Sequence, residues 1–151
     1  MNKFFFKIVT FLIISACSYE PILSTKNYNF YFENIETQGD KKINEIIKNK
    51  LLKSRGSNSY TIILNSKRDK NVITSNLKGD PTVFEIRAIT DYSIINNNQN
   101  ILNNKVEKKV NYNNINDKFE LTKYEDNLIK NLSINISEEI LTVVKSINKW
   151  L

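Results

Sequence analysis

The sequence has 151 residues, of which 40% are apolar and 25% charged, and a formal net charge of +6, a composition typical of a globular protein. It contains no histidine and a single cysteine, which excludes Ser-His-Asp and Cys-His catalysis and the common zinc sites, because these need an imidazole or several thiolates. Its three glycines lie too far apart for a glycine-rich phosphate loop, so we expect no catalytic residue, no metal site and no cofactor.

The amino terminus is typical of an export signal. Lys3 and Lys7 precede an apolar run over residues 8–14, and Ser15-Ala16 then precede Cys17. A membrane-spanning helix needs about 20 apolar residues, and this run is shorter. The ending resembles a bacterial lipobox, so we predict that residues 1–16 are a lipoprotein signal peptide and that Cys17 is the lipidated residue.

Two alternatives to the lipobox remain open: a secretory signal cut nearby, and a buried strand with an inert core cysteine. The lipobox is favoured because Cys17 follows the small pair directly and no other cysteine occurs. Two or more acyl chains hold a protein stably on a membrane, whereas one holds it only marginally. We therefore expect a membrane tether at Cys17.

The remaining 135 residues suit one domain. Residues 17–26 are predicted to be a lipidated tether, because Pro21 pushes the residue before it toward an extended conformation. Residues 27–151 are predicted to be a single domain. Its mild basic excess includes no polybasic tail, and no nucleic-acid partner is expected.

The first predicted strand covers residues 27–35 and is rich in aromatic residues with a period of two. Tyr28, Phe30 and Phe32 are expected on one face, and Tyr31 and Ile35 on the other. A helix is then predicted up to residues 55–56, since apolar residues recur at helical spacing at Ile43, Ile46, Ile47 and Leu51. Asp40 and Gly56 are the expected caps.

Residues 59–66 alternate as a strand, and residues 72–74 resume a weaker strand pattern after the charged segment 67–70. We expect a bend or bulge between these two strand segments. Residues 78–81, Lys-Gly-Asp-Pro, are the clearest turn signal. A long strand follows over residues 82–95, with one buried and one solvated face. The buried side is expected to hold Phe84, Ile86, Ala88, Tyr92 and Ile94, and the solvated side Glu85, Arg87 and Asp91.

An asparagine-rich segment over residues 96–100 is predicted to be a hairpin loop, because asparagine tolerates left-handed conformations. The returning strand is predicted over residues 101–112. Asp117 and Glu120 resemble a capping box that opens a last helix. The predicted apolar stripe of that helix is Leu128, Leu132, Ile136, Ile140, Val143 and Ile147.

The predicted element order is β-α-β-β-β-α, which indicates an α+β fold. We expect a two-layer α/β sandwich with a mixed four-stranded sheet and two helices on one face. A right-handed crossover through the first helix would make the first two strands parallel, and hairpins would add antiparallel neighbours. The last helix's apolar stripe is interpreted as the face that covers the sheet.

Three segments resemble one family in order and spacing. Residues 17–23, Cys-Ser-Tyr-Glu-Pro-Ile-Leu, resemble an opening of cysteine, small residue, aromatic, variable residue, proline and aliphatic. Residues 84–92 resemble a long central strand, and residues 110–113 with 124–128 resemble a closing strand and final helix. The mature chain thus resembles the LptE family, the lipoprotein partner of the outer-membrane lipopolysaccharide translocon, in its alphaproteobacterial form. It departs from that pattern by its enrichment in asparagine and lysine and its scarcity of glycine after Ile95.

The resemblance implies an outer-membrane, periplasm-facing lipoprotein that binds and plugs the LptD β-barrel and assists lipopolysaccharide transport and assembly. Ser18 also favours the outer membrane, since a known inner-membrane retention signal uses aspartate there. Lipopolysaccharide carries phosphates, and basic side chains are their natural contacts. The candidate contacts, each alternatively part of a solvated face, are Lys67, Arg68, Lys70, Lys78 and Arg87.

Two other functions remain open. The chain could be a structural or pilot lipoprotein of another envelope complex that binds protein only. It could also be a periplasmic enzyme with paired carboxylates. Glu138 and Glu139 are adjacent, but neighbouring positions of a helix do not face each other, so the sequence displays no such pair.

Overall fold

The computed structural model describes residues 28–149. Its elements, in chain order, are β1 (Phe30–Gly39), α2 (Lys41–Leu51), β2 (Asn58–Ser75), β3 (Pro81–Asn96), β4 (Gln99–Asn113) and α3 (Lys118–Ile147). The predicted signal peptide, Cys17 and the tether lie outside the described residues. So do Asn27, where the first strand was expected to start, and residues 150–151 at the end of the last predicted element.

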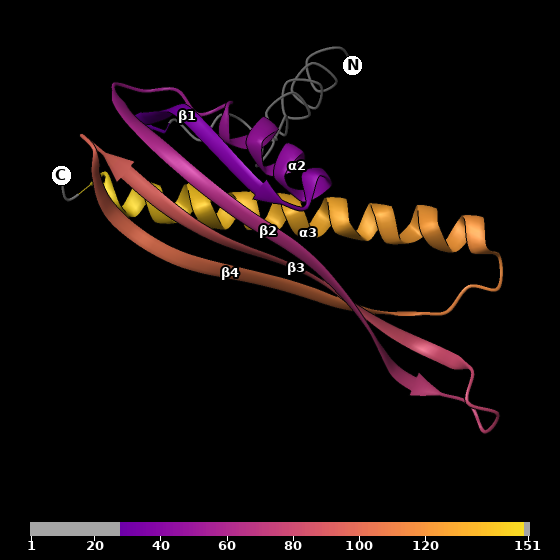
Figure 1. Cartoon of the computed structure of the whole chain (residues 1–151). Helices are drawn as coiled ribbons and strands as arrows, with labels where there is room; N and C mark the ends of the chain where they lie inside the picture. Colours follow the sequence, from indigo (N-terminus) through magenta and orange to yellow (C-terminus); the bar gives the residue numbers. More distant parts are fainter. Residues whose placement is uncertain (1–27, 150–151) are drawn as a thin grey trace, which may run out of the picture.

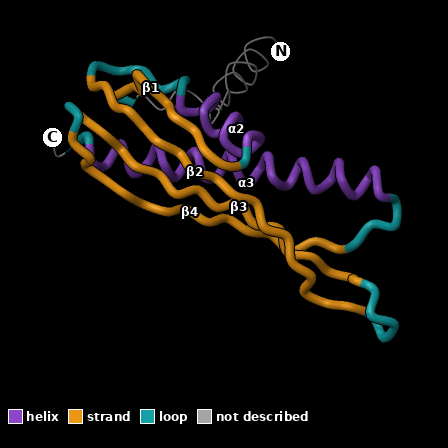
Figure 2. Tube along the Cα trace, viewed as in Figure 1, coloured by secondary structure: helices purple, strands orange, loops and turns teal. Residues whose placement is uncertain are grey.

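The four strands form one sheet in the order β1-β2-β3-β4. β1 and β2 are parallel and joined by α2, whereas β2, β3 and β4 follow one another as antiparallel hairpins. Figures 1 and 2 show α2 and α3 on the same side of this sheet, with the long α3 running beneath the strands. The α+β fold with a mixed four-stranded sheet and two helices is confirmed.

The core lies between the sheet and the two helices. Alternate residues of β2 are buried, namely Tyr60, Ile62 and Leu64, and the central strand β3 contributes Ile86, Ala88 and Ile94. The helices contribute Ile43, Ile47, Leu51, Ile129, Ile136 and Ile140, all fully buried. Burial of such side chains contributes about 1.5–3 kcal/mol each relative to exposure, so this layer is a major source of stabilisation.

The predicted faces of β1 are wrong in one respect. Phe32 pairs with Tyr60 and Asn34 pairs with Thr61, so Glu33 is an extra residue without a partner. Such a bulge inverts the alternation beyond it. Ile35 is therefore buried together with Phe30 and Phe32, although a strict period of two puts it on the opposite face.

The start of α2 agrees with prediction, and its end does not. Asp40 Oδ1 accepts a hydrogen bond of 3.0 Å from the backbone N–H of Ile43 and caps the helix. The helix ends at the C-cap Leu52. Gly56 lies beyond it and has another role, because a Cβ there would come within 2.1 Å of the backbone of Asn29. A glycine is needed so that the chain can pass the start of β1.

β2 and β3 are longer than predicted, because β2 continues through the charged segment 67–70. Its pairing with β3 is regular through residues 67–72, so the prediction of a bend or bulge between the two strand segments is wrong. The irregularities fall later, between Val72 and Thr74 and between Thr74 and Ser75. β4 last pairs with β3 between Asn113 and Val83. Beyond that point residues 73–82 form a two-stranded projection, called the hairpin arm below, which Figure 2 shows extending past the rest of the sheet.

Two predicted turns are confirmed with defined chemistry. At the tip of the hairpin arm, the Asn76 side-chain oxygen accepts hydrogen bonds of 2.9 Å from the N–H groups of Lys78 and Asp80, and Gly79 has a φ of +88°. Between β3 and β4, Asn97 and Asn98 have φ values of 48° and 61°. Two consecutive positive values match the type I′ hairpin turn, so the loop has two residues rather than five.

α3 begins as predicted: Asp117 Oδ1 accepts hydrogen bonds from the N–H groups of Phe119 and Glu120 at 2.8 and 3.0 Å. Leu132, Ile136 and Ile140 of the predicted stripe are buried. Leu128 is partly buried and packs against the core, also as predicted. The predicted stripe is wrong at Val143 and Ile147, which are only partly buried. The buried neighbours are Ile129, Ser133, Ser137, Leu141 and Val144, because the stripe of a straight helix drifts relative to a four-residue spacing.

Candidate binding surfaces

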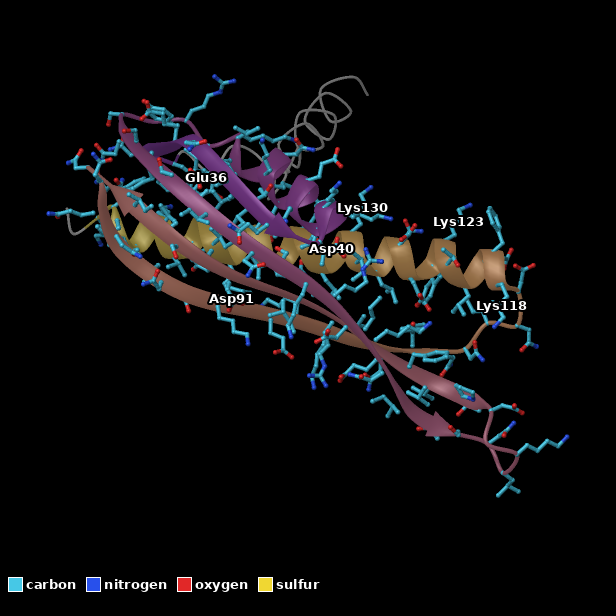
Figure 3. All side chains as sticks on the ribbon, viewed as in Figure 1. Glu36, Asp40, Asp91, Lys118, Lys123 and Lys130 are labelled. Atoms are coloured by element: carbon cyan, nitrogen blue, oxygen red, sulfur yellow. The ribbon has the colours of Figure 1, made fainter. Side chains whose placement is uncertain are left out.

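The side of the sheet away from the helices carries polar and charged side chains. This surface, called the open face below, comprises Asn65, Lys67 and Asp69 of β2, Glu85, Arg87 and Asp91 of β3, and Lys105, Glu107 and Lys109 of β4. The register sets Asp69, Arg87 and Lys109 side by side. In Figure 3 the side chain of Asp91 lies on this side, whereas Lys118, Lys123 and Lys130 lie along α3.

Alternating charges on the open face form an ion-pair network. Arg87 Nε donates to Glu85 Oε1 over 2.6 Å, and Lys109 Nζ lies 3.1 Å from Glu85 Oε2. Arg87 Nη1 also lies 3.6 Å from Glu107. The hydrogen bond from Arg87, followed by that from Lys109, lowers the pKa of Glu85, and the same bond raises the pKa of Arg87. The network therefore favours the ionised forms of Glu85 and Arg87 and links β3 to β4 through ion pairs.

The predicted solvated face of β3 is partly covered. Glu85 is only 5% exposed, because Arg87 and Lys109 lie over it, and Ile89 is 3% exposed. The register partners of Ile89 are Lys67 and Glu107, whose long side chains have apolar stems suited to covering it. The open face is thus a packed polar layer at its centre, rather than an array of freely solvated side chains.

A second cluster joins the sheet to the amino-terminal half of α3. Lys70 Nζ and the Tyr112 hydroxyl both donate to Glu125 Oε1, each over 2.6 Å. The Lys70 ammonium also lies 4.2 Å from the ring centroid of Phe84, which stacks on Tyr112. Burial, and then the bond to Glu125, raises the pKa of Tyr112 well above its ordinary value. This group, called the distal clamp below, takes one residue from each of β2, β3 and β4.

Arg68 lies beside the distal clamp at the junction of three elements. Its Nε is 3.3 Å from Asp40 Oδ2, and its Nη1 is 3.9 Å from Asp126. Asp126 also pairs with Lys42 at 2.6 Å. Because Asp40 caps α2 with its other oxygen, Arg68 connects the start of α2 to α3.

The five predicted lipopolysaccharide contacts do not form one patch. Lys67 and Arg87 lie on the open face, whereas Arg68 and Lys70 lie on the helix side of β2, where Arg68 forms an ion pair with Asp40 and Lys70 bonds to Glu125. Lys78 lies at the exposed tip of the hairpin arm. Alternation along a strand separates neighbours such as Lys67 and Arg68, and the prediction of a single patch ignored that separation.

The sequence did not predict that carboxylates would pair with the basic residues of the open face, nor that β4 contributes to this face. Glu85 was expected to be solvated, Glu107 and Lys109 were not among the predicted contacts, and nothing in the sequence alone pairs them. The alternation of charges in residues 105–109 was a signal of an exposed strand face. Their pairing became visible only with the register that sets Glu107 opposite Ile89 and Lys109 opposite Arg87.

A shallow pocket of about 400 Å³ lies on the open face toward the β3–β4 turn. Its lining is mostly polar and includes Asn65, Asp91, Ser93, Asn103 and Lys105. Among residues 28–149 there is no group of three or more acidic or cysteine residues placed to hold a metal ion. In the same part of the chain, no helix is long and apolar enough to cross a membrane.

Comparison with solved structures identifies lipoproteins of the same fold. The match to the crystal structure of rare lipoprotein B from Shewanella oneidensis has a TM-score of 0.60 at 11% sequence identity, and covers 76% of this chain and 96% of that chain. The match to the solution structure of an uncharacterized lipoprotein B from Nitrosomonas europaea has a TM-score of 0.59 at 11% identity, and covers 83% and 90% of the two chains. No family model and no curated protein matches the sequence. At these identities the likeness establishes a shared fold.

Proposed function

We propose that this chain is an outer-membrane lipoprotein of the LptE type, lipidated at Cys17 and facing the periplasm. In this proposal it binds and plugs an LptD-type β-barrel and assists lipopolysaccharide transport and assembly. The observation that carries the proposal is the combination of a lipobox-like ending at Cys17 with a fold shared with solved lipoproteins. The lipobox-like ending indicates the anchor, and the shared fold indicates the kind of domain that the anchor carries.

The open face supports a barrel partner. The lumen of a large membrane β-barrel is polar, so a domain that enters it needs a polar surface. The open face supplies alternating charges, with Arg87, Glu85 and Lys109 linked to one another and Lys67 near Asp69 at 3.5 Å. Such a surface can exchange hydrogen bonds with luminal side chains without exposing an apolar patch.

The basic groups that remain accessible are the proposed lipopolysaccharide contacts. Lys67 has a side chain that is 60% exposed, and Lys78 stands at the tip of the hairpin arm. Arg68 and Lys70 each hold one or more helix carboxylates, so a lipid phosphate would compete with those bonds. Arg87 likewise holds Glu85 at 2.6 Å and Glu107 at 3.6 Å. Lys67 and Lys78 therefore rank above Arg68, Lys70 and Arg87 in this proposal, and no catalytic role is assigned to any residue.

The test is co-purification of the tagged full-length protein from solubilised envelopes, followed by mass spectrometry of proteins and lipids. A stoichiometric outer-membrane barrel with bound lipopolysaccharide is the expected result. The matched control is Cys17→Ser, which removes the thiol that would carry the lipid and should reduce recovery of the barrel. Recovery of a different envelope complex without a barrel would overturn the proposal and favour a structural or pilot lipoprotein.

A further inference from the structure

One end of the molecule gathers the start of β1, the start of β2 and the end of α3. Asn148 of the α3 C-cap accepts hydrogen bonds from Asn58 at 2.6 Å and Tyr60 at 3.0 Å, and donates to the Asn29 carbonyl at 3.3 Å. Gly56, just after α2, lies against the backbone of Asn29. Figure 1 shows the C-terminal end of α3 and the β3–β4 turn at this end, opposite the hairpin arm. We call it the basal end.

The basal end is basic over the residues that the structure describes. Its elements contribute residues 28–32, 46–66 and 140–149, and none of these is aspartate or glutamate. The basic residues there are Lys48, Lys50, Lys53, Arg55, Lys145 and Lys149. All are exposed except the partly buried Lys50, and none belongs to an ion pair among the described residues. The nearest carboxylate on α3 toward this end is Glu138, whose charge helps to raise the pKa of Tyr28.

Proximity to the ends of helices explains the presence of some of these basic residues. Lys48, Lys50 and Lys145 lie in the last turns of α2 and α3, where a cation favours the helix dipole. Lys53 and Lys149 directly follow the C-caps Leu52 and Asn148 and lie at the same helix ends. Arg55 lies three residues beyond Leu52 and is not explained by the dipole. In the rest of the molecule, Lys42, Lys70, Lys108 and Arg87 all face a carboxylate. Lys105, Lys118 and Lys123 take part in no ion pair with another described residue either, but each has an aspartate or glutamate within three positions of the chain. The basal end differs in that the residues its elements contribute include no acidic side chain.

A pocket of about 480 Å³ opens at the basal end and has the donors that a phosphodiester accepts. It is lined by Asn29, Thr142, Lys145, Ser146, Asn148 and Lys149. Two ammonium groups are thus set among neutral amide and hydroxyl groups. With no carboxylate in the lining, a phosphate would meet donors without electrostatic repulsion.

The described chain also begins at this end. Tyr28 follows Cys17 by eleven positions. Eleven residues span at most about 40 Å when fully extended, so a lipid on Cys17 would keep the basal end close to the bilayer. This step rests on the lipid anchor in the proposed function.

We propose that, before the domain enters a barrel, the basal end docks on the anionic phospholipid surface of the membrane that holds the anchor, and that the hairpin arm then points away from it. Each basic group near such a surface strengthens association by about fivefold. Because the attraction is electrostatic, it falls within a Debye length and weakens with salt. The surface thus orients a domain that the lipid alone would leave free to rotate.

The test places a fluorophore on one introduced cysteine of the full lipidated protein, since the thiol of Cys17 is taken up by the lipid. Leu52→Cys reports on the basal end and Leu77→Cys on the hairpin arm; both side chains are exposed. The protein is reconstituted in phosphatidylcholine vesicles with or without about 30% phosphatidylglycerol, carrying a headgroup quencher. We expect at least about threefold more quenching at position 52 in the anionic vesicles, lost at about 0.5 M salt, and little quenching at position 77.

Two triple variants test whether the extra quenching in anionic vesicles depends on the basic residues of the basal end. Lys53→Glu, Arg55→Glu and Lys145→Glu together should abolish the anionic enhancement. The matched control, Lys118→Glu, Lys123→Glu and Lys130→Glu, makes the same charge change along the other half of α3 and should retain it. Equal quenching in both lipids, or equal effects of the two triple variants, would overturn the docking. Failure of the wild-type protein to float with either vesicle would instead overturn the anchor, and with it this orientation.

Discussion

Lys70 and Tyr112, on strands that are not neighbours, donate to the same carboxylate oxygen of Glu125, each over 2.6 Å. The shared acceptor lies on α3, so this pair of bonds joins β2 and β4 to the helix across β3. Phe84 of β3 fills the space beneath the ammonium. The distal clamp is therefore the point where the sheet, past the end of β1, is still held to the helical layer.

The first prediction concerns the coupling between Lys70 and Glu125. In a double-mutant cycle with Lys70→Met and Glu125→Gln, we expect a coupling energy of about 0.5–1 kcal/mol, since the pair is partly exposed. Methionine keeps an apolar stem over Phe84, so the cycle reports the charge rather than the packing. Urea unfolding at low and high salt measures it. Coupling that is zero at low salt would contradict the clamp.

The second prediction concerns alkaline pH. The raised pKa of Tyr112 means that its phenol keeps the proton in the folded protein after the unfolded chain has lost it. Its contribution is complete below the ordinary tyrosine pKa of 10.0 and is lost as pH rises above that value. Tyr112→Phe should therefore lose less stability than wild type between neutral pH and high pH, measured by urea unfolding. Tyr60 and Tyr92, whose pKa values are also raised, remain in both proteins and cancel in the comparison.

The third prediction concerns acid. The pKa of Glu85 is lowered, first by the hydrogen bond from Arg87, so the folded protein holds this carboxylate ionised more readily than the unfolded chain does. Its contribution is present above the ordinary value of 4.5 and is lost as pH falls through the folded value. The stability difference between wild type and Glu85→Gln should shrink as pH falls below that range. An unchanged difference in acid unfolding experiments would argue against the network.

The fourth prediction contrasts two glycines. Gly56→Ala should destabilise the domain by about 2–3 kcal/mol, because its Cβ would overlap backbone atoms of Asn29 and Phe30 that cannot rotate away. Gly79→Ala meets no atom within 4 Å and should cost only about 1 kcal/mol, from its positive φ. Thermal unfolding compares the two variants. Equal costs would mean that the chain after α2 can move away from β1.

The fifth prediction concerns lipopolysaccharide. Lys78→Glu combined with Arg87→Gln should weaken binding of purified lipopolysaccharide by about tenfold, as expected for the loss of charge-assisted contacts. Glutamine at position 87 avoids placing a new carboxylate beside Glu85 and Glu107. Circular dichroism checks the fold, and Lys118→Glu serves as a control away from the arm and the open face. Unchanged affinity would remove these two residues from the proposed contacts.

The spacing of apolar residues predicted the order of helices and strands, because most apolar side chains of this chain point into one buried layer. Residues 59–66 and 82–95 alternate enough to be predicted as strands, although Ile63 and Ile89 are apolar exceptions on the polar side. Asp40 and Asp117 begin helices as their side-chain chemistry requires. These are local properties. The polar turns at Asn76 and at Asn97-Asn98 are local in the same sense, and they too could be predicted.

Features that depend on pairing could not be predicted in this way. The bulge at Glu33 changes the face of Ile35, and no residue type at that position announces it. Glu85 is buried only because Arg87 and Lys109 cover it, and Lys109 arrives from another strand. The candidate contacts were grouped by charge and proximity in sequence, yet Lys67 and Arg68 lie on opposite sides of β2. Register and pleat decide such groupings.

The bonds of Asn148 to Asn29 and Asn58 span 119 and 90 positions of the chain. An exported chain emerges from the membrane with its amino-terminal part first, so the residues of every strand emerge well before the last turn of α3. Until then, the apolar side of the sheet has no cover over β3 and β4 and is accessible to other chains. The time between completion of β4 and docking of α3 is thus the interval in which a nascent molecule is most prone to aggregate, and a holding chaperone would act there.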